Sequence, residues 1–149
     1  MGYWHRLTPI SANFVREVEN LTPESLDAYL LGKYPKMDME DPFGWHLCRV
    51  AHVFLGRDIP SEAFQYGKPL FNRPETQEKF WHFSPYVVTR RSAGILIDCW
   101  YGYLVEAENA KQYKKASKEH KEYIDLLNER LRTLRILERR YSLFILYGW

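Results

Sequence analysis

The feature that most constrains the fold of this chain is its C-terminal heptapeptide, 141–147. Its sequence, Tyr-Ser-Leu-Phe-Ile-Leu-Tyr, is nearly all apolar and rich in residues that favour β structure. A run of this length is too short for a good helix, and a strand without polar alternation is buried on both faces of its sheet. We therefore predict an interior strand over 141–147, paired with the opening segment 3–7.

A long amphipathic helix is predicted directly before this strand. Asn109 and Gln112 have the spacing of a capping box, and apolar residues then recur every three or four positions through about residue 138. These are Tyr113, Ala116, His120, Tyr123, Ile124, Leu127, Leu131 and Leu134. A helix at about 109–138 followed by a buried strand predicts an α+β fold, in which a small sheet formed with the N- and C-terminal strands is packed by about five helices.

Further helix starts are indicated where a capping residue directly precedes proline. A side-chain oxygen at the N-cap accepts a backbone N–H, and proline at the next position loses no helical hydrogen bond. The pairs are Thr8-Pro9, Thr22-Pro23, Asp41-Pro42 and Ser84-Pro85. They predict helices at about 9–20, 23–32, 42–55 and 85–97, with Gly56 ending the third.

The segment 57–80 is expected to be a folded loop, because it contains three prolines and Gly67. One turn of helix is expected after Pro74, and residues 80–83 are a candidate short strand. No repeat, low-complexity tract or linker divides the sequence, so we expect a single α+β domain over 1–149.

The cysteines and the hydropathy pattern predict the cellular setting. Cys48 and Cys99 are the two cysteines of the chain, and both lie in apolar neighbourhoods, which favours buried thiols in a reducing compartment. The N-terminal segment lacks the features of a signal peptide, and no apolar run approaches the roughly 20 residues that span a bilayer. We expect a cytoplasmic protein without a membrane partner.

Several of these features resemble the YfbM-like family of bacterial proteins, whose function is unknown. Residues 1–9 are similar to the opening strand of that family, which leads to Thr-Pro. Asp41, Trp45 and Gly56 resemble one of its helices, although His46 and His52 depart from its histidine spacing. Residues 82–85 resemble a helix start of the family, and 109–147 resembles its closing helix and strand. The resemblance implies an α+β fold and no particular activity.

Few residues have the spacing of a metal or catalytic site. Cys48 and His52 are four residues apart, next to His46, as two metal ligands on one helix face would be. Cys48 also lies between Leu47 and Val50, however, where a small buried side chain is expected. Packing is the favoured interpretation, and we predict no metal, no cofactor and no catalytic residue.

An enzyme with an unrecognised His/Cys site is the alternative hypothesis. The residues around Cys99 match no cysteine-hydrolase signature, and the adjacent acidic Asp98 does not favour a nucleophilic cysteine there. The sequence His82-Phe83-Ser84 matches one motif of two-histidine phosphoesterases, but a second such motif is absent from the sequence. Such an enzyme would have to bring together His46, His52, His82 and Cys99.

Binding of nucleic acid through a basic helix, 111–140, is a further alternative. Lysines are dense in its first half and arginines in its second, and such a surface can contact phosphates. Acidic residues alternate with them throughout, which is typical of a solvated helix face with ion pairs along the helix. The formal net charge of +2 does not require an anionic partner either.

Aromatic residues provide the favoured functional hypothesis. The chain has five Trp, eleven Tyr and eight Phe, and Tyr and Trp are preferred anchors at protein interfaces. We predict a non-catalytic protein-binding domain, with an inhibitor or immunity-type role in a bacterial or phage conflict system as its class. A homodimer seam is another use for the same residues. The predicted contact surface, centred on 64–73 and 99–103, consists of Tyr66, Phe71, Arg73, Trp100, Tyr101 and Tyr103.

Overall fold

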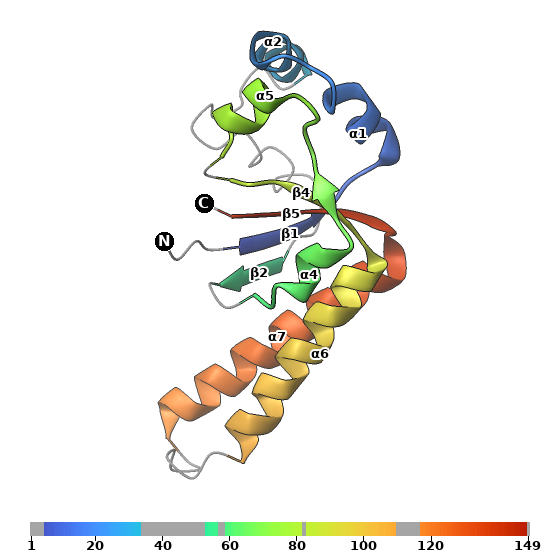
Figure 1. Ribbon diagram of the computed structural model, residues 1–149. Coiled ribbons are helices and arrows are strands. Elements are labelled where there is room, and N and C mark those ends of the chain that lie inside the picture. The colour runs from blue at the N-terminus through green and yellow to red at the C-terminus, as the bar shows by residue number, and fades with distance from the viewer. Residues whose placement is uncertain (1–4, 34–52, 57–58, 82, 110–116, 149) are drawn as a thin grey trace.

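A five-stranded antiparallel sheet forms the centre of the molecule (Figure 1). The computed structural model describes residues 5–33, 53–56, 59–81, 83–109 and 117–148. The strand order is β2-β1-β5-β4-β3, with the strands β1 (His5–Pro9), β2 (Val53–Gly56), β3 (Lys68–Pro69), β4 (Tyr86–Thr89) and β5 (Leu143–Gly148). The predicted α+β fold is confirmed, and the C-terminal strand occupies the middle of the sheet.

The strand β5 is buried on both faces, as its composition predicts. It pairs with β1 on one side, where Leu7 lies opposite Leu146, and with β4 on the other. Phe144 and Leu146 contribute to one core, and Ile145 and Tyr147 contribute to a second core. Because successive side chains of a strand point to opposite faces, one strand supports both cores.

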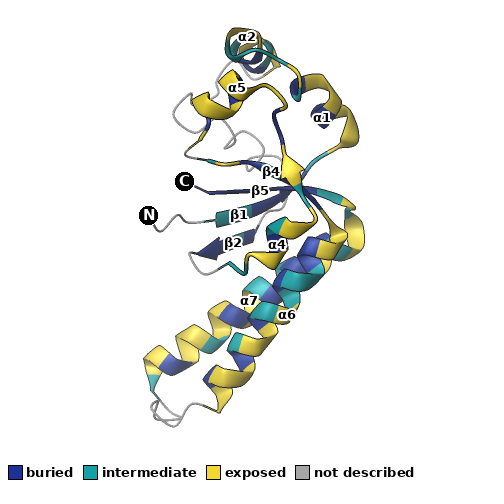
Figure 2. Ribbon diagram, in the orientation of Figure 1, coloured by how far each residue is buried: buried dark blue, intermediate teal, exposed yellow. Residues whose placement is uncertain are grey.

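The two long helices α6 (Arg90–Glu108) and α7 (Lys118–Arg140) cover one face of the sheet, together with the short α4 (Glu62–Gln65). Ser117 caps α7, since its side chain accepts a hydrogen bond from the backbone N–H of His120. Leu127, Leu131 and Leu134 then face α6 and the sheet at helical spacing. Figure 2 shows the buried residues along the seam between these helices and exposed residues on their outer sides.

The prediction that Asn109 caps the start of the long helix α7 is wrong. Asn109 ends α6 instead, and its side-chain amide donates to the carbonyl of Val105 at 2.9 Å. Gln112 lies outside the described residues.

Three short helices cover the opposite face: α1 (Ala12–Val18), α2 (Pro23–Lys33) and α5 (Pro74–Lys79). The prediction from Thr22-Pro23 is confirmed, because the Thr22 hydroxyl accepts from the N–H of Ser25 at the start of α2. The helical turn after Pro74 is confirmed as α5. The prediction from Thr8-Pro9 is wrong: Pro9 is the last residue of β1, and Ser11 caps α1.

The prediction of a helix from Ser84-Pro85 is also wrong. Pro85 leads into β4, and α6 begins only at Arg90. Val87 and Val88 fill opposite cores beside β5, and this packing overrides the local capping signal. The predicted strand over 80–83 is wrong as well, since Phe80, Trp81 and Phe83 lie in turns.

The third predicted helix falls largely on residues 34–52, which are outside the described residues. Its end is wrong, because Val53–Gly56 forms the edge strand β2. Gly56 has a positive φ of 77°, so it provides the backbone freedom expected of it, but at the end of a strand. Within 57–80, the expected loop contains α4, β3 and α5.

Candidate functional site

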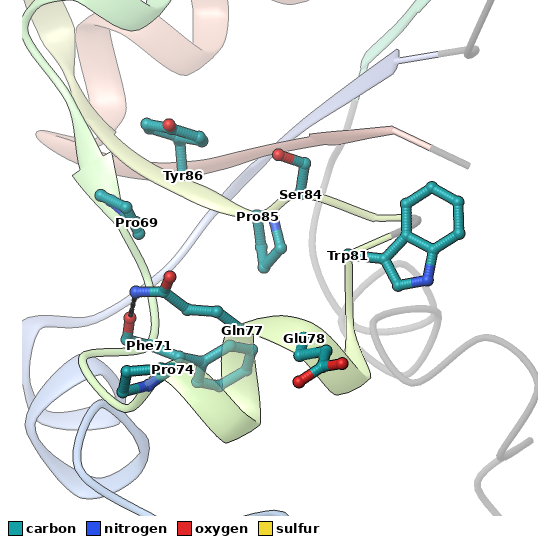
Figure 3. Close-up of a pocket in the computed structure, with 9 residues that line it drawn as sticks. All are labelled: Pro69, Phe71, Pro74, Gln77, Glu78, Trp81, Ser84, Pro85 and Tyr86. Atoms are coloured by element: carbon teal, nitrogen blue, oxygen red, sulfur yellow. Dashed lines mark hydrogen bonds between the residues drawn. The ribbon is translucent and has the colours of Figure 1, made fainter. Parts of the chain in front are cut away.

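A pocket of about 410 Å³ opens between β3, α5 and the segment that enters β4 (Figure 3). It lies beside the core formed with the three short helices, since Phe71 belongs to both. Its lining residues are Pro69, Phe71, Pro74, Gln77, Glu78, Trp81, Ser84, Pro85 and Tyr86. The lining is mainly apolar and aromatic, which is typical of a binding site with a few polar groups that set orientation.

Side-chain hydrogen bonds to the backbone fix the wall formed by α5. The Gln77 amide donates to the carbonyl of Phe71 at 2.7 Å, as Figure 3 shows, and so connects α5 to the segment after β3. Thr76 donates its hydroxyl to the carbonyl of Leu21 at 2.7 Å. The Arg73 guanidinium donates to the carbonyl of Asn20 at 2.6 Å. A helix of six residues is too short to be stable alone, and these bonds hold it against the loop before α2.

Three prolines stiffen the walls of the pocket. Pro69, Pro74 and Pro85 come from three separate segments of the lining. The backbone between them is also paired, since the N–H of Leu70 donates to the carbonyl of Pro85 at 2.9 Å. Because the proline ring fixes φ, these walls lose little conformational entropy when a ligand binds.

Aromatic side chains form the base and the rim. Phe71 is 2% exposed and packs on Phe80 with ring centroids 5.3 Å apart. Trp81, in contrast, is 52% exposed. Tyr86 is partly buried and meets Phe64 edge to face at 5.4 Å. The pocket therefore combines a fixed aromatic base with a large indole that is open to solvent.

The backbone of Ser84 adopts an unusual conformation in the pocket wall. Its φ of 39° is the only positive value at a non-glycine residue within the described part of the chain. The flanking backbone is held in place, since the N–H of Ser84 donates to the carbonyl of Phe80 at 3.1 Å and the N–H of Gly148 donates to the carbonyl of Phe83 at 2.8 Å. Backbone held in a sparsely populated region is concentrated at binding sites, where the surrounding structure maintains it.

Glu78 contributes the one carboxylate among the described residues of the lining. The neighbouring charges on α5 are paired elsewhere: Arg73 lies 3.4 Å from Glu75, and Lys79 contacts Asp27. No described residue forms an ion pair with Glu78. The pocket thus carries a local negative charge on a chain whose formal net charge is +2.

The structure does not bring the six predicted contact residues together on one surface. Phe71 and Trp100 are each 2% exposed and belong to different cores, on opposite faces of the sheet. They are packing residues, and the prediction that they form a common exposed surface is corrected. Apolar aromatics in a loop or helix match a core as well as a surface, so the sequence could not separate the two.

The remaining predicted contact residues are dispersed. Tyr66 is exposed and stacks on Arg91, whose guanidinium carbon lies 3.6 Å from the ring centroid. Tyr101 is 53% exposed on the outer side of α6, and Tyr103 packs edge-on against Trp100 at 5.5 Å. Arg73 lies at the start of α5, next to the pocket lining.

Sequence reasoning missed Trp81 and Glu78 as site residues. Trp81 was expected in a short strand over 80–83, because that stretch is apolar and rich in aromatic residues. The signal that could have identified the pocket is the concentration of prolines at 69, 74 and 85, which places several rigid turns around one aromatic segment.

A second hollow, of about 360 Å³, lies between α4 and α6. Its lining includes Glu62, Tyr66, Arg91, Asp98 and Cys99. The Cys99 thiol is free and partly buried. Among the described residues, no group of three or more His, Cys, Asp and Glu side chains has the arrangement of a metal site. His46, Cys48, His52 and His82 lie outside the described residues, so the His/Cys enzyme hypothesis stays a prediction.

The basic helix corresponds in its described part to α7. Its exposed side chains alternate in sign, as the sequence predicts, and Lys118 lies 3.8 Å from Glu122 one turn later. Residues 111–116 lie outside the described part, and nucleic-acid binding stays an alternative prediction.

Comparisons with known proteins do not assign this chain to a family. Over the residues that the structure describes, no helix has the length and apolar character needed to cross a membrane. The resemblance to the YfbM-like family stays a prediction. Comparison with protein-family models, with curated proteins and with solved structures found no match to this chain.

Proposed function

We propose that this chain is a non-catalytic protein-binding domain, and that the pocket between α5 and β3 receives a side chain of its partner. One observation carries the proposal: Trp81, 52% exposed, stands at the rim of an apolar pocket whose walls contain three prolines. Tryptophan is enriched among the residues that dominate binding energy at protein interfaces, especially beside pockets that a partner can fill.

The rigidity of the site supports the same function. Binding orders side chains and loops at a cost of roughly 0.5–1.5 kcal/mol for each flexible side chain. Here the hydrogen bonds of Arg73, Thr76 and Gln77 to backbone carbonyls fix the wall before any partner arrives. A preformed apolar pocket with one open aromatic anchor avoids much of that cost.

Two matched substitutions test the proposal. Trp81 and Tyr101 are 52% and 53% exposed; Trp81 follows α5 and Tyr101 lies on α6, and these two helices cover opposite faces of the sheet. The partner would be captured from the native cells, purified, and titrated by calorimetry against the unmodified chain, Trp81→Ala and Tyr101→Ala. We expect Trp81→Ala to weaken binding by about 30-fold, corresponding to the 2 kcal/mol threshold of an interface hot spot. Tyr101→Ala should leave the affinity unchanged.

The opposite result would move the interface to the other face of the molecule. If Tyr101→Ala weakens binding and Trp81→Ala does not, the partner binds the outer side of α6 and the pocket is not its site. About half of each side chain is exposed, so we expect both variants to fold. Circular dichroism checks this for each variant.

Within this proposal, an inhibitor or immunity-type protein of a bacterial or phage conflict system, acting in the reducing cytoplasm, remains the class we favour. It is supported by the small size of the chain and by the absence of a recognisable catalytic motif from its sequence. A toxin or defence gene next to this one would support that class, and a metabolic operon would count against it.

A further inference from the structure

We propose that the pocket receives a basic side chain of the partner, and specifically an arginine. This inference rests on the proposed protein-binding function and specifies its chemistry. The carboxylate of Glu78 and the indole of Trp81 are the groups that would recognise the guanidinium.

The two key groups both line the pocket and come from the end of α5 and the turn that follows it. Glu78 is in the last turn of α5, and Trp81 follows three residues later in the turn that ends the helix. The N–H of Trp81 donates to the carbonyl of Glu78 at 3.4 Å, so a backbone turn joins the two residues. Figure 3 shows Glu78 on α5 and Trp81 beyond the end of that helix, with Ser84 and Pro85 from the segment that enters β4, whereas the Tyr86 ring projects from the other side of β4.

Charge selects a cation as the occupant. Among the described lining residues, Glu78 is the one acidic side chain and none is basic. The nearby Glu75 and Asp27 are neutralised by Arg73 and Lys79, whereas no described residue pairs with Glu78. Glu78 is exposed, and a cationic side chain in the pocket could form a charge-assisted hydrogen bond with its carboxylate, whereas a neutral apolar side chain could not.

The aromatic lining selects arginine among the basic side chains. A planar guanidinium can stack on an aromatic face and still donate hydrogen bonds in its plane to a carboxylate, whereas a lysine ammonium is a compact, strongly hydrated charge. The chain already contains this kind of contact on its other face. Arg91 stacks 3.6 Å from the ring centroid of Tyr66 and donates to the Tyr66 hydroxyl at 2.9 Å.

A titration with small probes tests the chemistry without the partner. N-acetyl-arginine-N-methylamide, the corresponding lysine derivative and the norleucine derivative would each be added to the ¹⁵N-labelled full chain. The readout is the indole N–H signal of Trp81, assigned by its loss in Trp81→Phe. We expect a saturable shift with the arginine probe at millimolar concentration and at least about fivefold weaker binding of the norleucine probe, as a cation–aromatic contact predicts.

Two substitutions on one helix provide the matched control. Glu78→Gln should weaken the arginine probe by roughly 3- to 10-fold, because a charge-assisted hydrogen bond is stronger than a neutral one. The norleucine probe should be unaffected or bind slightly better. Glu75→Gln, also on α5 but outside the pocket lining, should leave all three probes unchanged.

Several outcomes would overturn this inference. These are norleucine binding at least as tightly as arginine, lysine binding more tightly than arginine, no saturable shift with any probe, or no effect of Glu78→Gln on the arginine probe. If any of these occurs while Trp81→Ala still weakens partner binding as expected, the arginine inference fails and the protein-binding function stands. If the arginine probe binds as expected but Trp81→Ala leaves the partner bound, the proposed function fails instead.

Discussion

The two faces of the sheet are built from different kinds of element. One face is covered mainly by α6 and α7, of 19 and 23 residues, which pack along their length through regularly spaced leucines. The other is covered by α1, α2 and α5, of 7, 11 and 6 residues. The long pair leaves little room for a deep site between its members, whereas the short segments leave a pocket at their junction.

The two faces also differ in what holds them together. Side-chain packing at helical spacing accounts for the α6–α7 face. The pocket face depends in addition on hydrogen bonds from Arg73 and Thr76 to backbone carbonyls of a distant segment, and from Gln77 to the nearby carbonyl of Phe71. A set of short elements held in this way can position rigid turns and aromatic groups around a hollow, and this is why the candidate site lies there.

The largest expected effects come from adjacent residues of β5 that face the two cores. Leu146 and Ile145 are both fully buried, on the α6–α7 face and on the pocket face respectively. Alanine at either position should lower the free energy of unfolding by about 2–5 kcal/mol. We expect the larger loss for Leu146→Ala, because the short segments can relax into the space left at Ile145 more readily than two long helices can.

Urea unfolding of both variants measures this difference. Amide hydrogen exchange gives a second measurement, in which Ile145→Ala should accelerate exchange in α1, α2 and α5 more than in α6 and α7. A greater loss of stability for Ile145→Ala than for Leu146→Ala would show that the short segments do not relax around a cavity more readily than the two long helices do.

Alanine substitutions at two glycines should change the stability of the chain in opposite directions. A Cβ atom at Gly67, just before β3, would lie 2.7 Å from a methyl of Val88 and 2.9 Å from the carbonyl oxygen of Val87. Gly67→Ala should therefore destabilise the chain by about 1–3 kcal/mol. Gly102 lies on the exposed side of α6 with nothing within 4 Å, and Gly102→Ala should stabilise the chain by about 0.5–1 kcal/mol. Thermal unfolding of the two variants gives both values, and shifts of the same sign would contradict the comparison.

The smallest expected effect concerns the contact between α1 and α2 on the pocket face. Partial burial raises the pKa of Tyr29 above 10.0, and its hydrogen bond to Glu17 acts in the same direction. The folded state thus favours neutral Tyr29, and the stability that follows is fully present below pH 10 and is lost as the pH rises through the folded-state pKa.

Replacement of this tyrosine isolates the effect. In Tyr29→Phe the part of the alkaline loss of stability that comes from this residue should disappear, a change of less than about 1 kcal/mol because the group is partly exposed. Urea unfolding between pH 9 and pH 11 measures it. Identical pH profiles for the two chains would show that Tyr29 does not link the stability of this face to pH.

Sequence patterns predicted the parts of the fold in which local preference and packing agree. The apolar run of β5, the leucine spacing of α7 and the Thr22-Pro23 cap of α2 each have one consistent interpretation, and the structure confirms them. Ser84-Pro85 has the same capping chemistry as Thr22-Pro23, but there Val87 and Val88 are needed on opposite sides of a strand beside β5. The competing interaction is a distant strand, which a local signal does not report.

For the candidate site, the sequence supplied the residue types and not their arrangement. It identified an excess of aromatics and the proline-rich segment 57–80, but it could not separate the buried Phe71 and Trp100 from the open Trp81. Burial depends on which elements meet across the sheet, and those contacts join residues far apart in the chain.

The sequence by itself determined an α+β chain with a central C-terminal strand, because a short, nearly all apolar run is buried on both faces only when it lies between two layers. The tertiary structure alone decided that one face would be two long helices and the other a set of short segments around a pocket. The physical reason is that β5 presents one set of side chains to each face, and the volume left on each side fixes which helices and turns can pack there.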